Sequence, residues 1–229
     1  MRRESHVRFC EGGGVRAPSA TRLIVGFEHE RDARRFLTMM RERLGAFALS
    51  LHPEKTRLIE FGRFADENRK RRGLGKPETF NFLGFTFISG KSRRGGFLIK
   101  RKSRRDRMRA KLKEVKQELR RCRHQPIPLQ GKWLRQVVTG YFNYHAVPTN
   151  IAALQAFRKD VVRLWHRILK RRGQKHRMTW DRINQLSNDW LPSAKILHPW
   201  PEQRFAVTHP RWEPYARIGH VRICAGGAQ

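Results

Sequence analysis

The spacing of apolar residues near the start of the chain predicts two short strands with a helix between them. Leu23–Phe27 is a short apolar run, which is typical of a buried strand. From Glu30 to Phe47 the apolar positions fall three or four residues apart, so one face of a helix is apolar. Pro53 blocks any continuation of this helix, and Thr56–Phe61 is predicted to form the second strand. The result is a β-α-β unit.

A β-hairpin is predicted after this unit. Residues 66–77 are charged, contain glycine and are expected to form a loop. Phe80–Phe87 alternates apolar residues with smaller or polar ones, and residues 97–99 are apolar again. Glycines and basic residues lie between the two runs, so the hairpin is predicted to have a basic, glycine-rich tip.

From about Ser103 onward the apolar period becomes helical, which predicts a bundle of four helices. Pro126 and Pro128 separate the first helix from the second, and Pro148-Thr149-Asn150 forms a turn with N-cap candidates before the third. Thr179 is a candidate cap for the fourth. No helix can bury its apolar stripe alone, so the four are expected to pack together. The apolar positions of the first helix form a seam of the a/d type, made of Met108, Leu112, Val115, Leu119 and Cys122.

The predicted fold class is therefore α+β, with four parts along the chain. Residues 1–20 are expected to be irregular, because glycines and a proline interrupt them without any apolar period. Residues 21–100 hold the β-α-β unit and the hairpin, and residues 101–190 hold the helical bundle. Residues 191–229 contain prolines and tryptophans and are expected to form an irregular tail packed on the bundle.

Charge narrows the class of partner. The chain has 51 Lys and Arg against 19 Asp and Glu, a formal net charge of +32. Such a chain repels itself, and binding to a polyanion relieves the repulsion with release of counterions. A membrane surface would require a basic amphipathic helix at a terminus or a lipidation signal, and neither is found. Because 38% of the residues are hydrophobic, a disordered basic tail is excluded and a folded nucleic-acid-binding protein is favoured.

The most basic segment is residues 101–123, where 12 of 23 residues are Lys or Arg and three are acidic. This imbalance is too large for ion pairs within a helix to neutralise, so contact with nucleic-acid phosphates is predicted. Tyr144 lies off the main apolar stripe and is a candidate for stacking on a base, although core packing is the commoner role of an aromatic residue. The candidate nucleic-acid-binding residues are Arg93, Arg94, Lys100, Arg101, Lys102, Arg104, Arg105, Arg107, Arg109, Lys111, Lys113, Arg135 and Tyr144.

No catalytic or metal-binding pattern is evident, so neither a metal nor a cofactor is expected for this chain alone. A nucleophilic triad, a phosphate-binding loop and a strand with paired carboxylates are all lacking. The pairs His6/Cys10 and His220/Cys224 have a spacing that zinc ligands use, but zinc would need both pairs to meet. The three cysteines form no CxxC pair, which fits a reducing cytoplasm. No signal peptide or membrane segment is predicted.

Three segments, in this order, resemble the group II intron reverse transcriptase/maturase family, and its bacterial members in particular. They are Leu49-Ser-Leu-His-Pro-Glu-Lys55-Thr-Arg-Leu-Ile, Phe82-Leu-Gly-Phe85 and Gly140-Tyr-Phe-Asn-Tyr-His-Ala-Val. The resemblance implies a partial palm over residues 21–100, with Phe82–Phe85 as the primer-grip hairpin. It also implies that residues 101–190 are the thumb, or maturase domain, which binds intron RNA and assists its folding and splicing. Lys55 would lie in the palm turn that approaches an incoming triphosphate.

The chain departs from the family at the residues that perform polymerisation. Where the family carries Tyr-Ala-Asp-Asp, just ahead of Leu23–Phe27, this chain has Ser19-Ala20-Thr21-Arg22. Phosphoryl transfer with two metal ions needs those carboxylates to hold Mg²⁺, so Mg²⁺ is expected only for an intact family member. The fingers and the first half of the palm are not recognisable either. The resemblance therefore implies an RNA-binding chain without polymerase activity of its own, and Lys55 is only a residual palm-motif lysine.

Two alternatives stay open at this point, and DNA stays open as a second ligand. The chain could be one half of a split, active RNA-directed DNA polymerase, completed by a separate fingers and palm polypeptide. It could instead be a non-functional pseudogene product, which the irregular first 20 residues favour. The resemblance of the segment at His6–Cys10 to that at His220–Cys224 also favours a gene-boundary accident. A basic ribosome-associated protein ranks last, because the predicted β-α-β unit and the apolar content do not fit it.

Overall fold

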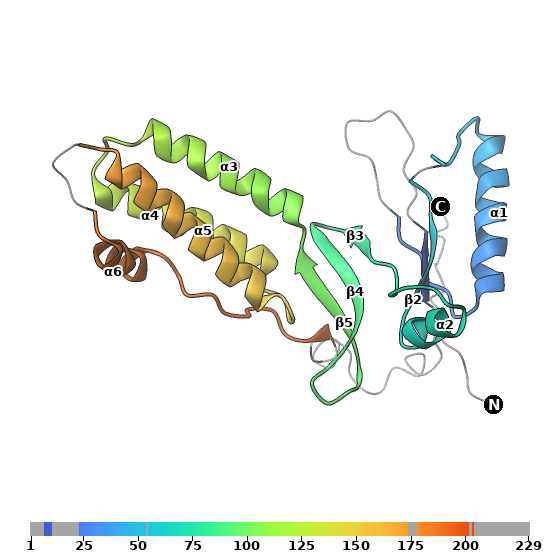
Figure 1. Ribbon diagram of the computed structural model, residues 1–229. Coiled ribbons are helices and arrows are strands. Elements are labelled where there is room, and N and C mark those ends of the chain that lie inside the picture. The colour runs from blue at the N-terminus through green and yellow to red at the C-terminus, as the bar shows by residue number, and fades with distance from the viewer. Residues whose placement is uncertain (1–6, 11–22, 54, 174–177, 202, 204–229) are drawn as a thin grey trace, which may run out of the picture.

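The computed structural model describes residues 7–10, 23–53, 55–173, 178–201 and 203, and these form the α+β fold that the sequence predicts. Figure 1 shows a helical bundle on one side and two further helices with a small two-stranded sheet on the other. A three-stranded sheet lies between the two parts and leads directly into the bundle.

The N-terminal part differs from the predicted β-α-β unit. Its helix, α1 (Glu30–Ala46), and its strand β2 (Leu58–Phe61) are confirmed. The predicted strand Leu23–Phe27 is wrong, since only Leu23 makes an isolated bridge. Strand β2 pairs instead with β1 (Val7–Cys10), in an antiparallel ladder that runs from Val7–Phe61 to Cys10–Leu58. The expectation that residues 1–20 are irregular is therefore wrong for these four residues. An apolar run predicts burial, and Ile24 does pack against the small core beside β2, but the run does not specify a ladder partner.

A short helix, α2 (Ala65–Arg71), occupies part of the predicted loop over residues 66–77. Asp66 lies in its first turn and Lys70 in its last, an order that complements the helix dipole, and their side chains pair at 3.0 Å. Gly73 follows with a φ of 67°, the left-handed conformation that commonly ends a helix. The helix has only seven residues and six of them are polar or charged, so it gives no apolar period to detect.

The predicted hairpin is confirmed and extended to a three-stranded antiparallel sheet in the order β3 (Phe80–Phe82), β4 (Phe85–Lys91) and β5 (Phe97–Ser103). The predicted first strand is broken at Leu83-Gly84. Both residues have positive φ, 43° and 77°, as a tight two-residue turn between paired strands requires. Strand β5 runs four residues beyond the predicted one, so its basic end belongs to the sheet and not to the first helix of the bundle.

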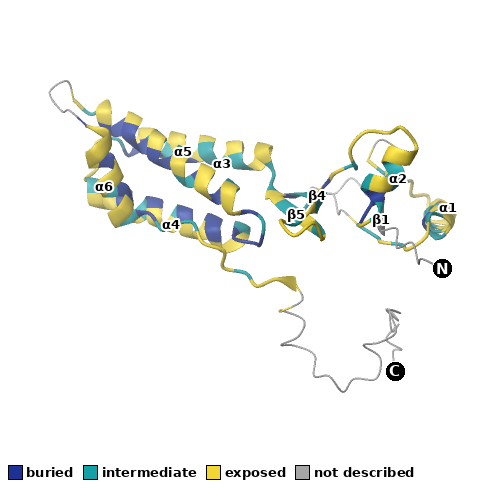
Figure 2. Ribbon diagram, turned by 60° about the horizontal axis from the view of Figure 1, so that its bottom comes forward, coloured by how far each residue is buried: buried dark blue, intermediate teal, exposed yellow. Residues whose placement is uncertain are grey.

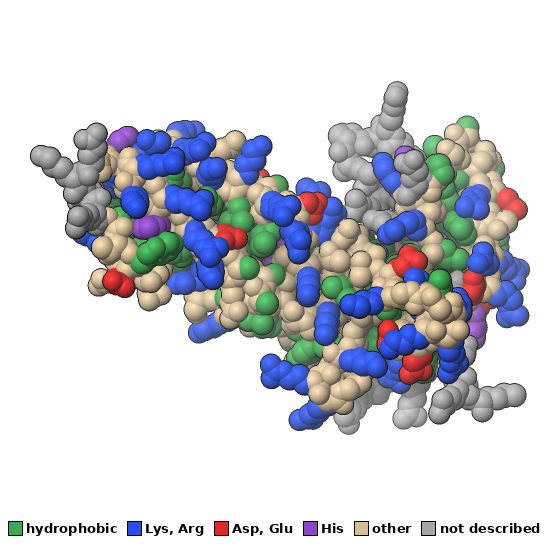
Figure 3. Space-filling model, in the orientation of Figure 1, with side chains coloured by type: hydrophobic (Ala, Val, Ile, Leu, Met, Phe, Trp, Pro, Cys, Tyr) green, Lys and Arg blue, Asp and Glu red, His purple; other side chains and the backbone are tan. Residues whose placement is uncertain are grey.

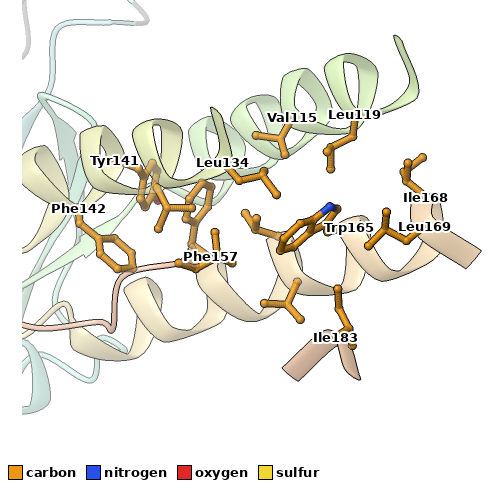
Figure 4. Close-up of a cluster of buried hydrophobic side chains, with 14 of the residues drawn as sticks. Val115, Leu119, Leu134, Tyr141, Phe142, Phe157, Trp165, Ile168, Leu169 and Ile183 are labelled. Atoms are coloured by element: carbon orange, nitrogen blue, oxygen red, sulfur yellow. The ribbon is translucent and has the colours of Figure 1, made fainter. Parts of the chain in front are cut away.

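All four predicted helices of the bundle are confirmed, as α3 (Arg105–Arg121), α4 (Ile127–His145), α5 (Ile151–Lys170) and α6 (Trp180–Trp190). Figure 4 shows side chains from these helices converging on one core. Within the predicted seam of α3, Val115, Leu119 and Cys122 are buried, while Met108 and Leu112 are partly buried against the same core.

A buried amide joins three of these helices. The Gln130 side chain of α4 donates to the carbonyl oxygen of Cys122 at 2.8 Å, at the end of α3. Its own oxygen accepts from the indole N–H of Trp165 in α5 at 2.9 Å. Every polar atom of Gln130 is thereby satisfied inside the core, so the amide fixes how the helices meet without leaving an unpaired group.

Burial is uneven between the two parts of the chain (Figure 2). The bundle holds the large core, whereas the core beside β2 consists of Ile59, Phe61 and Phe80 with three partly buried neighbours. On the predicted apolar face of α1 only Ala33 is buried, and Phe47, just past its end, is 68% exposed. The bundle is therefore the best-packed support for a binding surface.

The described part of the predicted tail runs along the bundle and back towards the sheet (Figure 1). The backbone N–H groups of Leu197 and His198 both donate to the carbonyl oxygen of Ala146, at 3.0 and 3.1 Å. The His198 side chain also lies 2.6 Å from the carbonyl oxygen of Asn143. This agrees with the expectation that the tail packs on the bundle, and its remainder from residue 204 lies outside the described residues.

Candidate nucleic-acid interface

The first part of the candidate site is the outer surface of α3. Because its apolar seam is narrow, most of the remaining positions face solvent, and basic residues occupy most of them. Two predicted residues are partly neutralised: Arg104 makes a bidentate pair with Asp106, which lowers the pKa of that carboxyl, and Lys111 pairs with Glu114 at 2.8 Å. The exposed cations of α3 are Arg105, Arg107, Arg109, Lys113, Lys116, Arg120 and Arg121.

A second row of cations, on α5, was not predicted. Lys159, Arg163, Arg167 and Lys170 are all exposed and fall three or four residues apart, so they form one line along the helix. Of these, Arg163 has an acidic partner, Asp160, at 3.2 Å. The signal was present in the sequence, because these cations alternate with the apolar stripe that predicted the helix. Since α3 packs directly beside α5, the bundle carries cations on two adjacent helices.

On the face seen in Figure 3, Lys and Arg side chains extend over the bundle and continue over the three-stranded sheet, with few acidic side chains among them. On the sheet, however, the predicted group Lys100, Arg101 and Lys102 is divided. Successive side chains of a strand point to opposite faces. Lys100 and Lys102 therefore share one face, and Arg101 lies on the other, opposite Phe87 of β4. Partial burial there lowers the pKa of Arg101.

The predicted Arg93 and Arg94 are exposed in the turn at the tip of the β4–β5 hairpin. The turn is closed by a backbone hydrogen bond of 2.7 Å from Ser92 to the carbonyl oxygen of Gly96. Gly95 has a φ of 79° there, a conformation that glycine adopts without strain. The two arginines are thus presented to solvent by a closed turn.

Arg135 has a structural role that sequence reasoning missed. Its guanidinium donates to the carbonyl oxygens of Asp189 and Trp190 at 2.6 and 3.0 Å, at the end of α6. The same group lies 5.4 Å from the centre of the Trp190 ring. It therefore satisfies carbonyls that α6 leaves without a helical partner, and it fastens α6 to α4.

Tyr144, the candidate base-stacking residue, lies where the bundle meets the sheet. Its ring is stacked on that of Phe85, with centroids 5.7 Å apart, and its hydroxyl donates to the carbonyl oxygen of Leu83 at 2.8 Å. The residue is 52% exposed. One side of the ring thus supports the β3–β4 turn. Tyr144 therefore connects the bundle with the sheet, a role that its position off the apolar stripe did not indicate.

A polar network, which we term the β5–α5 lock, fastens the sheet to the bundle and consists of Ser103, His145, Thr149 and Asn150. The Asn150 side chain accepts from the Ser103 backbone at 2.9 Å and donates to the Ser103 hydroxyl and the His145 carbonyl, both at 2.8 Å. Thr149 accepts from the Arg101 backbone at 2.8 Å.

The lock corrects the role predicted for the Pro148–Asn150 turn. Asn150 is the residue that precedes α5, but its side chain makes no capping bond within the described chain. Asn150 is buried, and its side chain makes hydrogen bonds to Ser103 of β5 instead. As a result, the cations of the sheet and those of the bundle share one firmly connected support.

The His145 ring lies inside this junction. Its Nδ1 is 3.2 Å from the Ser103 hydroxyl oxygen, and its ring packs against Tyr141 and Phe85, with centroids 4.3 and 5.1 Å away. Burial among these groups lowers the pKa of His145 to about 4. The ring is therefore neutral at physiological pH and adds no charge to the basic surface.

The remaining sequence candidates are Lys55 and the two His/Cys pairs. Lys55 is exposed in the turn before β2, where its backbone N–H donates to the His52 carbonyl at 3.2 Å. Among the residues that the structure describes, no three His, Cys, Asp or Glu lie together as a metal site would need. Residues 19–22, His6, His220, Cys224 and the side chain of Cys10 lie outside the described part. The described helices include none that is long and apolar enough to cross a lipid bilayer.

No family model matches this chain, and no curated protein matches it.

Proposed function

We propose that this chain binds RNA through the exposed cations of α3 and α5, and that it assists the folding and splicing of an intron RNA in the manner of a group II intron maturase. The observation that carries the proposal is the arrangement of these cations. They lie in two rows on adjacent, well-packed helices, and few acidic side chains lie near them. A rigid cationic surface of this kind matches the phosphates of a folded polyanion.

The resemblance to the maturase family supports an intron RNA as the ligand, and the positions of the family-like segments in space agree with it. Two of the three family-like segments, far apart in sequence, meet in the structure, because Tyr144 contacts both Leu83 and Phe85. In the proposed arrangement the sheet acts as a primer-grip hairpin and the bundle as the thumb. The β5–α5 lock then sets the angle between them, so that both cationic surfaces face the same RNA.

The proposal assigns no polymerase activity to the chain alone. Ser19-Ala20-Thr21-Arg22 stands where the family carries the carboxylates that hold Mg²⁺, and the lysine at position 55 cannot replace them. Phosphate contacts fix position and give affinity without reading bases. Affinity and positioning of this kind are what an RNA-folding role requires of the cationic surface on α3 and α5.

Fluorescence anisotropy with a labelled structured RNA tests the proposal. In the test variant, four exposed cations of α3 that have no acidic partner among the described residues, Arg109, Lys113, Lys116 and Arg120, are changed to Gln. Each lost phosphate contact should weaken binding, so the affinity at 0.1 M salt is expected to fall by at least about 100-fold.

The matched control removes four exposed cations from α1 by changing Arg31, Arg35, Arg41 and Arg43 to Gln. Its net charge equals that of the test variant. If binding depended only on net charge, both variants would therefore lose the same amount of RNA affinity. The proposal requires the control to bind within a few-fold of the wild type. Equal losses in both variants would contradict a binding surface on the bundle.

A further inference from the structure

A pocket of about 670 Å³ lies between α5 and α6, on the part of the bundle that no residue of the predicted set occupies. Its described wall is formed mainly by polar and charged side chains, together with the aromatic ring of Trp180. Lys159 and Arg163, two members of the cationic row on α5, are also part of that wall. A cationic group and an aromatic ring therefore border the same hollow.

Trp180 is presented as a flat, supported surface. Its ring packs against the His166 ring with centroids 4.2 Å apart, while 53% of the residue remains exposed. His166 is buried, and its Nε2 lies 3.0 Å from the carbonyl oxygen of Met178, which fixes the supporting ring. An aromatic ring that is held on one side and exposed to solvent is arranged as a stacking platform for a planar ligand.

Amide groups on α6, the helix that carries Trp180, form a further part of the wall, and an arginine of α5 holds one of them. The Arg158 guanidinium donates to the carbonyl oxygens of Ser187 and Pro192 at 3.0 and 3.1 Å, and to the Asn188 side-chain oxygen at 3.2 Å. Because the Asn188 oxygen accepts from Arg158, the NH₂ group is the part of this amide that is left to donate. Asn184 adds a second exposed amide to the same wall. Amides of this kind hydrogen-bond to the edges of unpaired bases.

We propose that this pocket binds one unpaired nucleotide of the RNA, with its base stacked on Trp180 and its phosphate beside Lys159 and Arg163. The inference rests on the proposed function in taking RNA as the ligand, and it adds a local preference for a bulged or looped-out base. A base-paired nucleotide cannot enter, because its faces are covered by its neighbours in the duplex. A free phosphate would use the cations but would leave the indole and the amides without a role.

Three RNA hairpins of one sequence test this proposal by anisotropy: one with a single-nucleotide bulge, one with an abasic residue at the bulge, and one without a bulge. The wild-type chain is expected to bind the bulged RNA about five- to 100-fold more tightly than the abasic one, the range that stacking of one base provides. The Trp180→Ala variant should lose this preference while its affinity for the abasic RNA stays unchanged.

Two variants control for loss of structure. Trp180→Phe keeps a stacking ring and should keep most of the preference. Trp200→Ala removes another exposed tryptophan, 43% exposed, that does not line the pocket, and it should keep all of the preference. If Trp180→Ala melts at a lower temperature than the wild type, Asn184→Leu fills the pocket from an exposed helix position and should abolish the preference in its place.

The outcomes separate this inference from the proposed function. Equal wild-type affinity for the bulged and abasic hairpins would overturn the nucleotide pocket and leave phosphate binding intact. The same conclusion follows if Trp180→Ala and Asn184→Leu both retain the preference. Absence of binding to all three hairpins would contradict RNA binding itself. The variant with four Gln substitutions on α3 should weaken all three complexes alike and leave the preference for the bulge unchanged.

Discussion

The Asn150 side chain holds Ser103 at both its backbone N–H and its hydroxyl, 2.9 and 2.8 Å away, although 47 residues separate the two in sequence. One buried amide thereby connects the last residue of the three-stranded sheet with the start of α5. Among the described residues, Tyr144 and Thr149 also make hydrogen bonds between the sheet and the bundle. The position of the hairpin relative to the bundle depends on this contact.

Asn150→Ala should therefore destabilise the chain more than the loss of an exposed amide does. The substitution removes three hydrogen bonds and leaves partly buried donors and acceptors of β5 and α4 unpaired, at an expected cost of about 2–4 kcal/mol. Urea unfolding, monitored by circular dichroism, measures this change in the free energy of unfolding. Asn81→Ala is the control, because Asn81 is exposed on β3 and its loss should cost less than about 1 kcal/mol. Equal costs would show that the lock does not support the fold.

Gly131 and Gly140, both on α4, should respond in opposite ways to substitution by alanine. A Cβ at Gly131 would lie 2.4 Å from Cδ2 of Trp190, so Gly131→Ala forces α6 away from α4 and should cost about 1–3 kcal/mol. At Gly140 no described atom lies within 4 Å of a Cβ. Because alanine favours the helix, Gly140→Ala should stabilise the chain by up to about 1 kcal/mol. Thermal melts of the two variants check the signs, and a stable Gly131→Ala would refute the close α4–α6 contact.

The pH dependence of stability should reveal the buried His145. Its pKa is about 4 in the folded chain, below the ordinary value of 6.5, so the unfolded chain binds the proton more readily. The stabilising contribution is complete above pH 6.5 and is lost as the pH falls towards 4. Because the ring is partly in contact with solvent, a loss of about 1 kcal/mol is expected between pH 7 and pH 5.

His145→Gln removes the titrating group and should flatten this part of the stability curve. Urea midpoints at pH 7, 6 and 5, for the wild type and the variant in the same buffers, give the difference directly. An identical decline in both proteins would assign the pH dependence to other groups and contradict the burial of this ring.

Primer extension distinguishes an RNA-binding chain from half of a split polymerase. The purified chain with Mg²⁺, a primed RNA template and deoxynucleotides is expected to give no product, because Ser19–Arg22 supplies no carboxylate for metal binding. Product made by the chain alone would overturn that assignment. Product that requires a separately encoded fingers and palm polypeptide would instead support the split enzyme.

The sequence predicted those parts of the fold in which a long apolar period exists. The seam of α3 and the stripes of α4, α5 and α6 recur over three or more turns, and all four helices are confirmed. Helix α2 has too few residues to show a period. The pairing of β2 with β1 was missed because a strand ladder is formed by backbone hydrogen bonds. The order of side chains along the sequence does not indicate which strands pair.

The candidate site was predicted less completely, for two physical reasons. Lys100, Arg101 and Lys102 are adjacent in sequence, but the alternation of a strand sends Arg101 to the opposite face. The sequence also does not reveal which cations make hydrogen bonds within the protein. Arg135 and Arg158 bind helix-end carbonyls of α6, whereas the exposed row on α5 has the spacing of a surface stripe and could have been predicted from it.

The salt dependence of RNA affinity tests the central claim most directly, because it counts the phosphates that the bundle neutralises. For the wild type, log K plotted against log salt should be linear and steep, with a slope between about −0.7 and −0.9 for each phosphate contacted. Changing Arg109, Lys113, Lys116 and Arg120 to Gln should make that slope shallower by about three to four, while the α1 control should retain the wild-type slope. An unchanged slope in the α3 variant would contradict RNA binding by the bundle.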